Sequence, residues 1–151
     1  MMQTNHDFYK DFSPEERKLL QQIEVIEDYP SEQMIISIGE RNRDILFIKS
    51  GTADIITTDI SGQDKVIGEI SSGEILGEMN FVIPLRRTAS IRAKTHTSVI
   101  RYPYKSLCQL LLSEVYLGAR FLKAINECQS IKLYHTLEMY CQKGIEKNTS
   151  Q

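Results

Sequence analysis

The spacing of the apolar residues changes twice along this chain of 151 residues, and the middle stretch most restricts the possible fold. Between Pro30 and Tyr102 the apolar residues form short runs rich in isoleucine and valine, and glycine-containing turns separate these runs. The runs cover residues 34–38, 45–48, 53–58, 66–70 and 98–102. Short strands with frequent turn signals are typical of closed antiparallel barrels and sandwiches. We therefore expect an antiparallel jelly-roll-like β-barrel over about residues 30–103.

A helix is expected before the barrel. Ser13 can cap its first turn, Pro14 suits the first helical position, and Glu16 completes a capping box. The residues expected to face inward are Leu19, Leu20 and Ile23. The helical pattern fades before Tyr29, so the helix should end ahead of the barrel.

Helical spacing returns at Tyr104. Apolar residues then recur at steps of three and four, which predicts one short helix and one long helix over about residues 104–143. These residues are Leu107, Leu110, Leu111, Leu117, Phe121, Ala124, Cys128 and Ile131. The long helix should reach about Cys141, with Gly118 as its one weak position. The expected fold is mainly β with α, in a single domain that spans residues 1–151.

Composition and charge exclude some classes of function. The net charge is -2 and the basic residues are spread along the chain, whereas a duplex-DNA surface needs a concentrated basic patch. The chain has no run of eighteen apolar residues, which a membrane-spanning helix would need. Residues 1–7 lack the layout of a secretory signal. We therefore expect a cytoplasmic protein that binds neither DNA nor a membrane.

Side chains suited to catalysis or metal binding are scattered. The histidines are dispersed, no serine is paired with histidine and aspartate, and the cysteines lack metal-binding spacing. The three cysteines are Cys108, Cys128 and Cys141, which we expect to be buried free thiols. The sequence indicates no catalytic residue, no metal ligand and no enzyme.

The segment from residue 73 to residue 93 combines residue types that suit a phosphate joined to a ribose. Gly77 permits a turn that a side chain would obstruct, and a short helix can begin after it. Arg87 carries a permanently charged guanidinium whose shape matches phosphate oxygens. Glu78 repels a phosphate but can accept hydrogen bonds from a sugar hydroxyl.

This segment resembles the signature of the cyclic-nucleotide-binding domain family. The family includes bacterial catabolite activator proteins, regulatory subunits of cyclic-AMP-dependent kinases and cyclic-nucleotide-gated channels. Its pattern is Gly-Glu, a short helix, then Arg, a small residue, Ala and Ser or Thr, as in Gly77–Glu78 and residues 87–90 here. The strand-and-glycine framework at residues 47–51 and 73–74 is similar as well. The resemblance covers roughly residues 13–142.

The resemblance implies a role for each matching residue. Glu78 would bind the ribose 2′-hydroxyl and Arg87 an exocyclic phosphate oxygen, at a site for cAMP or cGMP. Thr88 resembles members that favour cGMP, although members that bind cAMP also tolerate a hydroxyl there, so both nucleotides remain candidates. The expected ligand-binding residues are Gly77, Glu78, Met79, Asn80, Arg87, Thr88 and Ala89, with Ile67, Ile70 and Leu76 on the apolar side of the pocket.

Two residues depart from the family pattern. Asn80 stands where members usually have Ala, Gly or Ser, and its larger side chain can crowd the phosphate or redirect a hydrogen bond. Pro84 lies three residues before Arg87, whereas many members have a proline directly before the arginine. The first departure bears on affinity and the second on the shape of the loop.

The expected function is that of a stand-alone bacterial-type sensor module. The helix around residues 126–133 would close over the base, and the long helix, at about 42 Å for roughly 28 residues, would pair with a second copy in a homodimer. About ten residues follow Cys141, too few for a helix-turn-helix domain, so the signal would pass to an unknown downstream protein. The alternative is a dimerisation or scaffold module that keeps the fold without the nucleotide.

Overall fold

The computed structural model describes residues 7–149, with side chains up to residue 144. The first six residues, and with them most of the segment that lacks a secretory layout, lie outside the described part. The elements in chain order are α1 (Pro14–Ile23), β1 (Val25–Tyr29), β2 (Met34–Ile36), β3 (Ile45–Ser50), β4 (Thr52–Thr58), β5 (Asp64–Ser71), β6 (Ile75–Leu76), α2 (Glu78–Val82), β7 (Ser90–Ala93), β8 (Thr97–Tyr102), α3 (Tyr104–Ser113) and α4 (Val115–Thr149). This order confirms the expected jelly-roll-like architecture between an N-terminal helix and two C-terminal helices.

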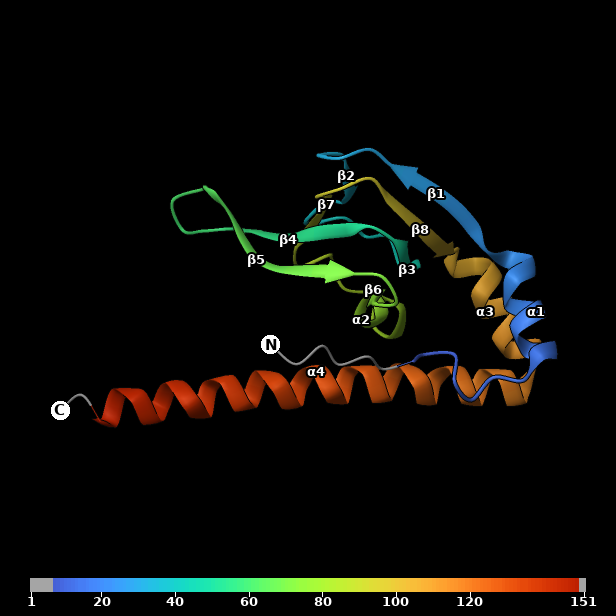
Figure 1. Ribbon diagram of the computed structural model, residues 1–151. Helices are drawn as coiled ribbons and strands as arrows, with labels where there is room; N and C mark the ends of the chain where they lie inside the picture. Colours follow the sequence, from blue (N-terminus) through green and yellow to red (C-terminus); the bar gives the residue numbers. More distant parts are fainter. Residues whose placement is uncertain (1–6, 150–151) are drawn as a thin grey trace.

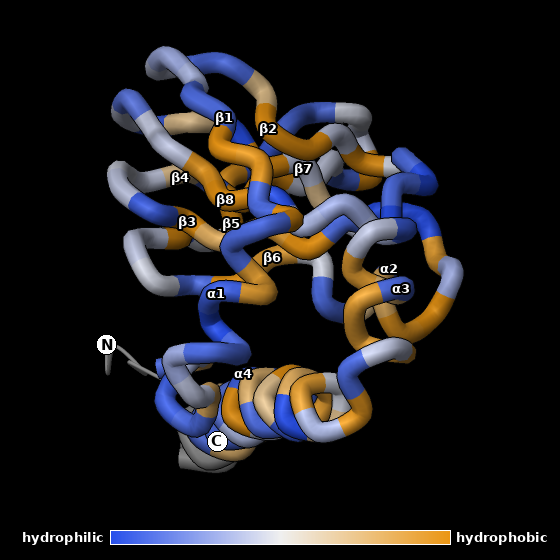
Figure 2. Tube along the Cα trace, turned by 90° about the vertical axis from the view of Figure 1, so that its right-hand side faces the viewer, coloured by the Kyte–Doolittle hydropathy of each residue, from blue (hydrophilic) through white to orange (hydrophobic). Residues whose placement is uncertain are grey.

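The strands form two antiparallel sheets that face each other. One sheet has the order β1-β8-β3-β6 and the other the order β2-β7-β4-β5. Buried apolar residues form an inner core between the sheets. Helix α4 runs along one side of the sheets (Figures 1 and 2). The buried residues of this inner core are Ile35, Ile36, Leu46, Ile48, Ala53, Ile70, Leu76, Ile91, Ala93 and Val99.

Strand β3 is buried on both faces, because it separates the inner core from the helices. Leu46 and Ile48 belong to the inner core, whereas Ile45 and Phe47 belong to a second core formed with α1, α3 and α4. A strand covered on both faces needs apolar residues without alternation, which explains the run 45–48. Strand β3 therefore separates the two cores, and its Ile45 and Phe47 side chains pack against the helices.

The N-terminal helix begins as the sequence predicts. The Ser13 hydroxyl accepts from the Glu16 amide at 3.1 Å, and the Glu16 carboxylate accepts from the Ser13 amide at 3.1 Å. The helix ends at Ile23, and the chain continues as β1, a strand that the sequence reading did not anticipate. Strand β1 pairs along its whole length with β8, so pairing with a distant segment decides its conformation.

The long helix α4 extends farther than predicted. It has 35 residues and passes Gly118 without a break. Its first half is buried against the barrel and the other helices through Leu117, Phe121, Ala124, Ile125 and Cys128. Its C-terminal turns extend past the tip of the β4–β5 hairpin (Figure 1). In the part of the chain that is described, no helix is long and apolar enough to cross a membrane.

The cysteines differ in exposure, which corrects the expectation that all three are buried. Cys128 is buried and Cys108 is half-buried, whereas Cys141 is exposed on the part of α4 that extends from the barrel. Burial raises the pKa of the Cys128 thiol to about 11. All three thiols are free, as expected.

Candidate functional site

Gly77 occupies a turn that only glycine can adopt without strain. It lies between β6 and α2 with a φ of 81°, in the left-handed region. A Cβ atom at this position would lie 2.7 Å from the Asp44 carbonyl oxygen and would overlap the Arg87 guanidinium. The missing side chain therefore lets Arg87 lie directly against the backbone of the turn.

The Arg87 side chain is buried, with 5% of its surface exposed. Its Nη2 donates to the Asp44 carbonyl oxygen at 2.8 Å and to Asn42 Oδ1 at 3.3 Å, and its Nη1 donates to Asn80 Oδ1 at 3.2 Å. Its Nε is buried without a hydrogen-bond partner. Burial lowers the pKa of Arg87, although the nearby carboxylates of Asp44 and Glu40 oppose this shift. A buried donor that lacks an acceptor is costly, which marks this guanidinium as a site for an additional acceptor.

The loop before β3 connects Arg87 to the C-terminal helices. Arg43 donates to the carbonyl oxygens of Asn80 at 2.9 Å and Phe81 at 2.8 Å, and its guanidinium lies 4.2 Å from the centre of the Tyr104 ring. The Asp44 carboxylate accepts from the Tyr104 amide at 2.7 Å. Consecutive residues of this loop therefore contact α2, Arg87 and the first residue of α3.

Sequence reasoning missed this loop. Residues 40–44 form a charged stretch between two strands, which is typical of a solvated connection. This loop leads into β3, which pairs with β6 and β8 in one sheet. The pairing brings the loop beside α2, Arg87 and α3, and no local sequence signal predicts these contacts.

Glu78, the first residue of α2, is 5% exposed and is paired with a lysine from α4. Lys132 Nζ lies 2.5 Å from Glu78 Oε1 and also donates to the Ile75 carbonyl oxygen at 3.3 Å. The sequence reading did not single out Lys132. Its position one helical turn after Cys128, on the face of α4 that is buried against the barrel, is the signal that was available.

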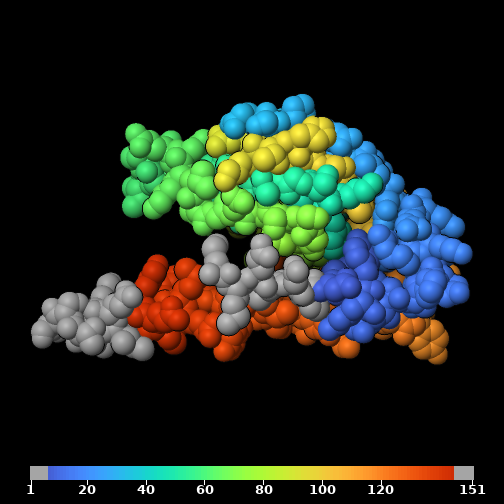
Figure 3. All heavy atoms as spheres, in the orientation of Figure 1, coloured from blue at the N-terminus to red at the C-terminus, as the bar shows by residue number. Residues whose placement is uncertain are grey.

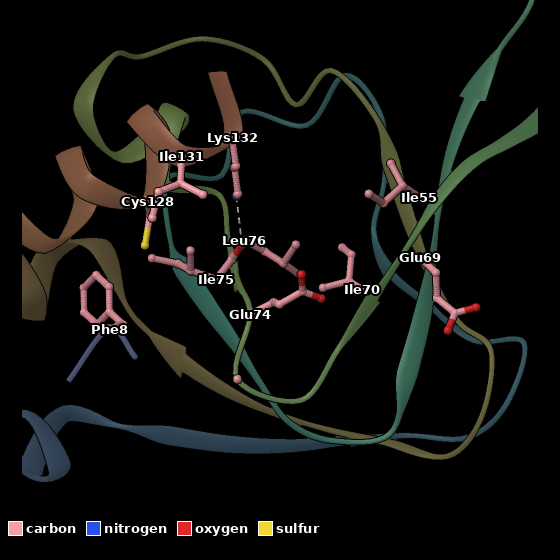
Figure 4. Close-up of a pocket in the computed structure, with 11 residues that line it drawn as sticks. Phe8, Ile55, Glu69, Ile70, Glu74, Ile75, Leu76, Cys128, Ile131 and Lys132 are labelled. Carbon is pink, nitrogen blue, oxygen red and sulfur yellow. Dashed lines mark hydrogen bonds between the residues drawn. The ribbon is translucent and has the colours of Figure 1, made fainter. Parts of the chain in front are cut away.

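A cavity of about 160 Å³ lies beside this pair, between the barrel and α4. Ile70 and Leu76 line it from β5 and β6, while Ile131 and Lys132 line it from α4 (Figure 4). The full lining is Phe8, Ile55, Glu69, Ile70, Gly73, Glu74, Ile75, Leu76, Cys128, Ile131 and Lys132. The cavity thus combines apolar walls with one ammonium group and two carboxylates.

The structure brings some of the expected site residues together and leaves others apart. Ile70 and Leu76 line the cavity, whereas Ile67 is 57% exposed on β5 and lies outside the lining. Asn80 is buried against Arg87, Met79 is 53% exposed, and Thr88 and Ala89 follow Arg87 at the entry to β7 as exposed and half-buried residues. Gly77, Glu78 and Arg87 do not line the cavity themselves, but Lys132 joins its wall to Glu78.

Comparisons with a family model, with curated proteins and with solved structures all find cyclic-nucleotide-binding proteins. The family model described as "Cyclic nucleotide-binding domain" matches residues 26–114. The cAMP-activated global transcriptional regulator CRP of Salmonella typhimurium is 30% identical over 87 residues, which are 57% of this chain and 41% of that protein. The chain therefore spans less than half the length of this relative.

Solved structures share the fold. A cyclic nucleotide-binding domain from Methylobacillus flagellatus has a TM-score of 0.82 at 23% identity, covering 89% of this chain and 76% of that one. The c-di-GMP responsive global regulator CLP of Xanthomonas campestris has a TM-score of 0.73 at 23% identity, covering 86% and 64%. Because the family model matches more than half of the chain, we conclude that this chain belongs to the cyclic nucleotide-binding domain family.

Proposed function

We propose that this chain binds a cyclic nucleoside monophosphate, cAMP or cGMP, and acts as a cytoplasmic regulatory sensor. The observation that carries the proposal is the buried Arg87 guanidinium, whose Nε lacks an acceptor while the residue packs against the side-chain-free turn at Gly77. A phosphate oxygen would supply the missing acceptor. Charged hydrogen bonds of this kind contribute roughly 1.5–3 kcal/mol each.

The remaining site residues fit a nucleoside. Glu78 can accept from a ribose hydroxyl, and the apolar walls formed by Ile70, Leu76 and Ile131 can pack against the base. Backbone amides near Met79 and Thr88 would complete the contacts to the phosphate. This assignment gives each part of the nucleotide a partner of matching chemistry.

The choice of nucleotide rests on the relatives and on Thr88. CRP is described as cAMP-activated and CLP as responsive to c-di-GMP. The exposed Thr88 hydroxyl follows Arg87 directly and is free to meet a guanine amino group. We therefore include cAMP, cGMP and c-di-GMP as separate ligands in the test below.

We further propose that the output passes through α4 to a homodimer and then to a separate protein partner. The face of α4 opposite the buried residues carries an exposed apolar stripe at helical spacing. The stripe consists of Val115, Leu122, Leu133, Leu137 and Tyr140. In the space-filling view α4 forms one long edge of the molecule (Figure 3). A second copy of the same helix would cover this stripe.

Isothermal titration calorimetry with the three nucleotides tests the binding proposal. We expect heat of binding from at least one cyclic mononucleotide, and affinity that is roughly 10- to 100-fold weaker in Arg87→Ala, because at least one charged hydrogen bond is lost. The matched control is Arg86→Ala, since the neighbouring arginine is exposed and donates to the Gly39 carbonyl oxygen outside the cavity.

Arg87→Lys separates lost recognition from lost folding. Lysine keeps the positive charge but cannot form the two-pronged contact of a guanidinium, so this variant should keep the melting temperature better than Arg87→Ala and still bind weakly. The absence of heat with both cAMP and cGMP, at protein concentrations well above micromolar, would contradict the proposed function, and heat from c-di-GMP alone would point to a different ligand.

A second candidate function is a dimerisation or scaffold module without nucleotide. The observation in its favour is that Asn80 and Lys132 already contact the two side chains assigned to the ligand. This candidate predicts that Arg87→Lys leaves oligomeric state and partner binding unchanged with or without nucleotide. Sedimentation measured under both conditions distinguishes the two candidates.

A further inference from the structure

The carboxylate of Glu78 is held by a residue of α4. Lys132 Nζ is 2.5 Å from Glu78 Oε1, and the same ammonium donates to the Ile75 carbonyl oxygen in β6. Glu78 is 5% exposed, whereas 54% of the Lys132 side chain is exposed. The lysine therefore reaches inward from the helix surface to a carboxylate that solvent barely contacts. Figure 4 shows Lys132 extending from α4 toward Ile75, with the hydrogen bond to the Ile75 carbonyl oxygen dashed.

The same helix limits the size of the cavity. Small-molecule sites usually have volumes of roughly 300–1,000 Å³, and this cavity measures about 160 Å³. Its α4 wall consists of Cys128, Ile131 and Lys132. We expect a nucleoside that enters fully between β6 and α4 to push this part of α4 outward, which separates Lys132 from the barrel.

We propose that Lys132 competes with the nucleotide for Glu78 and thereby lowers its affinity and holds α4 against the barrel. The inference rests on the proposed function, because the ribose hydroxyl is the group that replaces the ammonium. Nucleotide binding is then an exchange: the hydroxyl takes over the carboxylate, Lys132 returns to solvent, and this section of α4 is released.

The burial of Glu78 decides whether removing the Lys132 charge raises or lowers the affinity for nucleotide. A buried carboxylate that loses its lysine is left without a strong partner, and such groups are destabilising. A hydroxyl that arrives at the same carboxylate relieves this penalty instead of displacing an ion pair. Removing the lysine charge should therefore make nucleotide binding tighter. If Lys132 contacted the nucleotide itself, removing its charge would make binding weaker.

The experiment compares Lys132→Met, Lys132→Arg and Lys123→Met with the unmodified chain. Methionine keeps much of the length of the side chain without the charge, and arginine keeps the charge. Lys123 lies on the same helix but pairs with Asp11 and Glu127 away from the cavity, so its variant is the matched control. Calorimetry with cAMP and cGMP measures affinity, and hydrogen exchange of residues 126–140 without nucleotide measures the release of α4.

We expect Lys132→Met to bind nucleotide roughly tenfold more tightly, the effect of about one charged hydrogen bond, and to exchange faster in α4. Lys132→Arg and Lys123→Met should behave like the unmodified chain. Unchanged or weaker binding by Lys132→Met, with binding retained by the unmodified chain, overturns the competition and leaves the proposed function intact. An absence of binding by every protein overturns the proposed function and the competition together.

Discussion

Arg87 is surrounded by oxygen atoms that belong to the protein itself. Asn80 makes the most consequential of these contacts, because its Oδ1 accepts from Arg87 and its Nδ2 donates to the Leu85 carbonyl oxygen. One amide group therefore holds both the arginine and the loop that precedes it. At this position Asn80 competes with a phosphate oxygen for the Nη1 nitrogen of Arg87.

Replacing Asn80 by serine should free the arginine. Serine is too short to keep both contacts, so we expect nucleotide affinity to rise by roughly three- to tenfold and stability to fall by about 0.5–1.5 kcal/mol for each hydrogen bond lost. Calorimetry and thermal unfolding check the two effects. Gln109→Ser, an exposed change on α3 away from the candidate site, serves as the control. Weaker binding by Asn80→Ser would show instead that Asn80 itself contacts the ligand.

The contact between α3 and α4 depends on one glycine. A Cβ atom at Gly118 would lie 2.5 Å from the Leu111 carbonyl oxygen, closer than a carbon and a backbone oxygen can approach. The two helices can pack at this distance only because the side chain is missing. From the sequence alone, Gly118 indicated a weak point of the helix, whereas its position is decided by the neighbouring helix.

Gly118→Ala should destabilise the protein although alanine favours helix formation. Forcing the helices apart costs about 1–3 kcal/mol, and a loss of about 2 kcal/mol lowers the melting temperature by roughly 4–8 °C in a chain of this size. Gly144→Ala is the control, since nothing lies within 4 Å of a Cβ there, and it should leave stability equal or slightly higher. Equal melting temperatures for both variants would argue against the close contact.

The junction between α1 and α4 should make stability depend on pH. Burial alone would raise the pKa of Glu16, but hydrogen bonds from Arg120 and Ser13 outweigh it and hold the pKa below the ordinary 4.5. A carboxylate with a lowered pKa in the folded state stabilises the protein above its unfolded pKa. This contribution is lost as the pH falls through the folded pKa.

Glu16→Gln should therefore be less stable than the unmodified chain at neutral pH, and the difference should shrink in acid. Urea unfolding at about pH 7 and about pH 3 measures both. Glu15→Gln is the control, because Glu15 lies in the same first turn but is exposed. A difference that is independent of pH would assign the effect of Glu16 to packing instead of charge.

At the scale of the whole molecule, α4 both covers the barrel and exposes an apolar stripe. Its 35 residues extend to about 52 Å at 1.5 Å per residue, and the buried contacts end near Cys128. Leu133, Leu137 and Tyr140 are 60%, 55% and 71% exposed beyond that point. A helix with one buried face and a second apolar face is suited to hold two copies together while it responds to the cavity.

Leu137→Glu should shift the proposed dimer to monomers. Placing a carboxylate opposite its own copy in an apolar seam is strongly unfavourable, and sedimentation equilibrium measures the result. Gln142→Glu is the matched control, since this exposed residue lies on the opposite face of the helix. Equal molecular mass for both variants and the unmodified chain would exclude α4 as the interface.

Local sequence determined much of the architecture. The capping box at Ser13, the β-branched runs and the return of helical spacing at Tyr104 are short-range signals, and each formed the expected type of element. Strand β1 was not predictable in this way, because residues 25–29 become a strand by pairing with β8, about seventy residues away in sequence. The length of α4 was underestimated because the prediction followed the apolar spacing, which fades near Cys141, whereas the helix continues to Thr149.

The residue types of the candidate site could also be proposed from the sequence, because glycine, glutamate and arginine occur at this spacing together with Thr88, Ala89 and Ser90 and after a run of short strands. Only the tertiary structure decided what these side chains contact. Lys132 reaches Glu78 from 54 residues farther along the chain, and Asn42 and Asp44 reach Arg87 from more than forty residues earlier. Hydrogen bonds and packing between segments so distant depend on how sheets and helices meet in space, which no local pattern encodes.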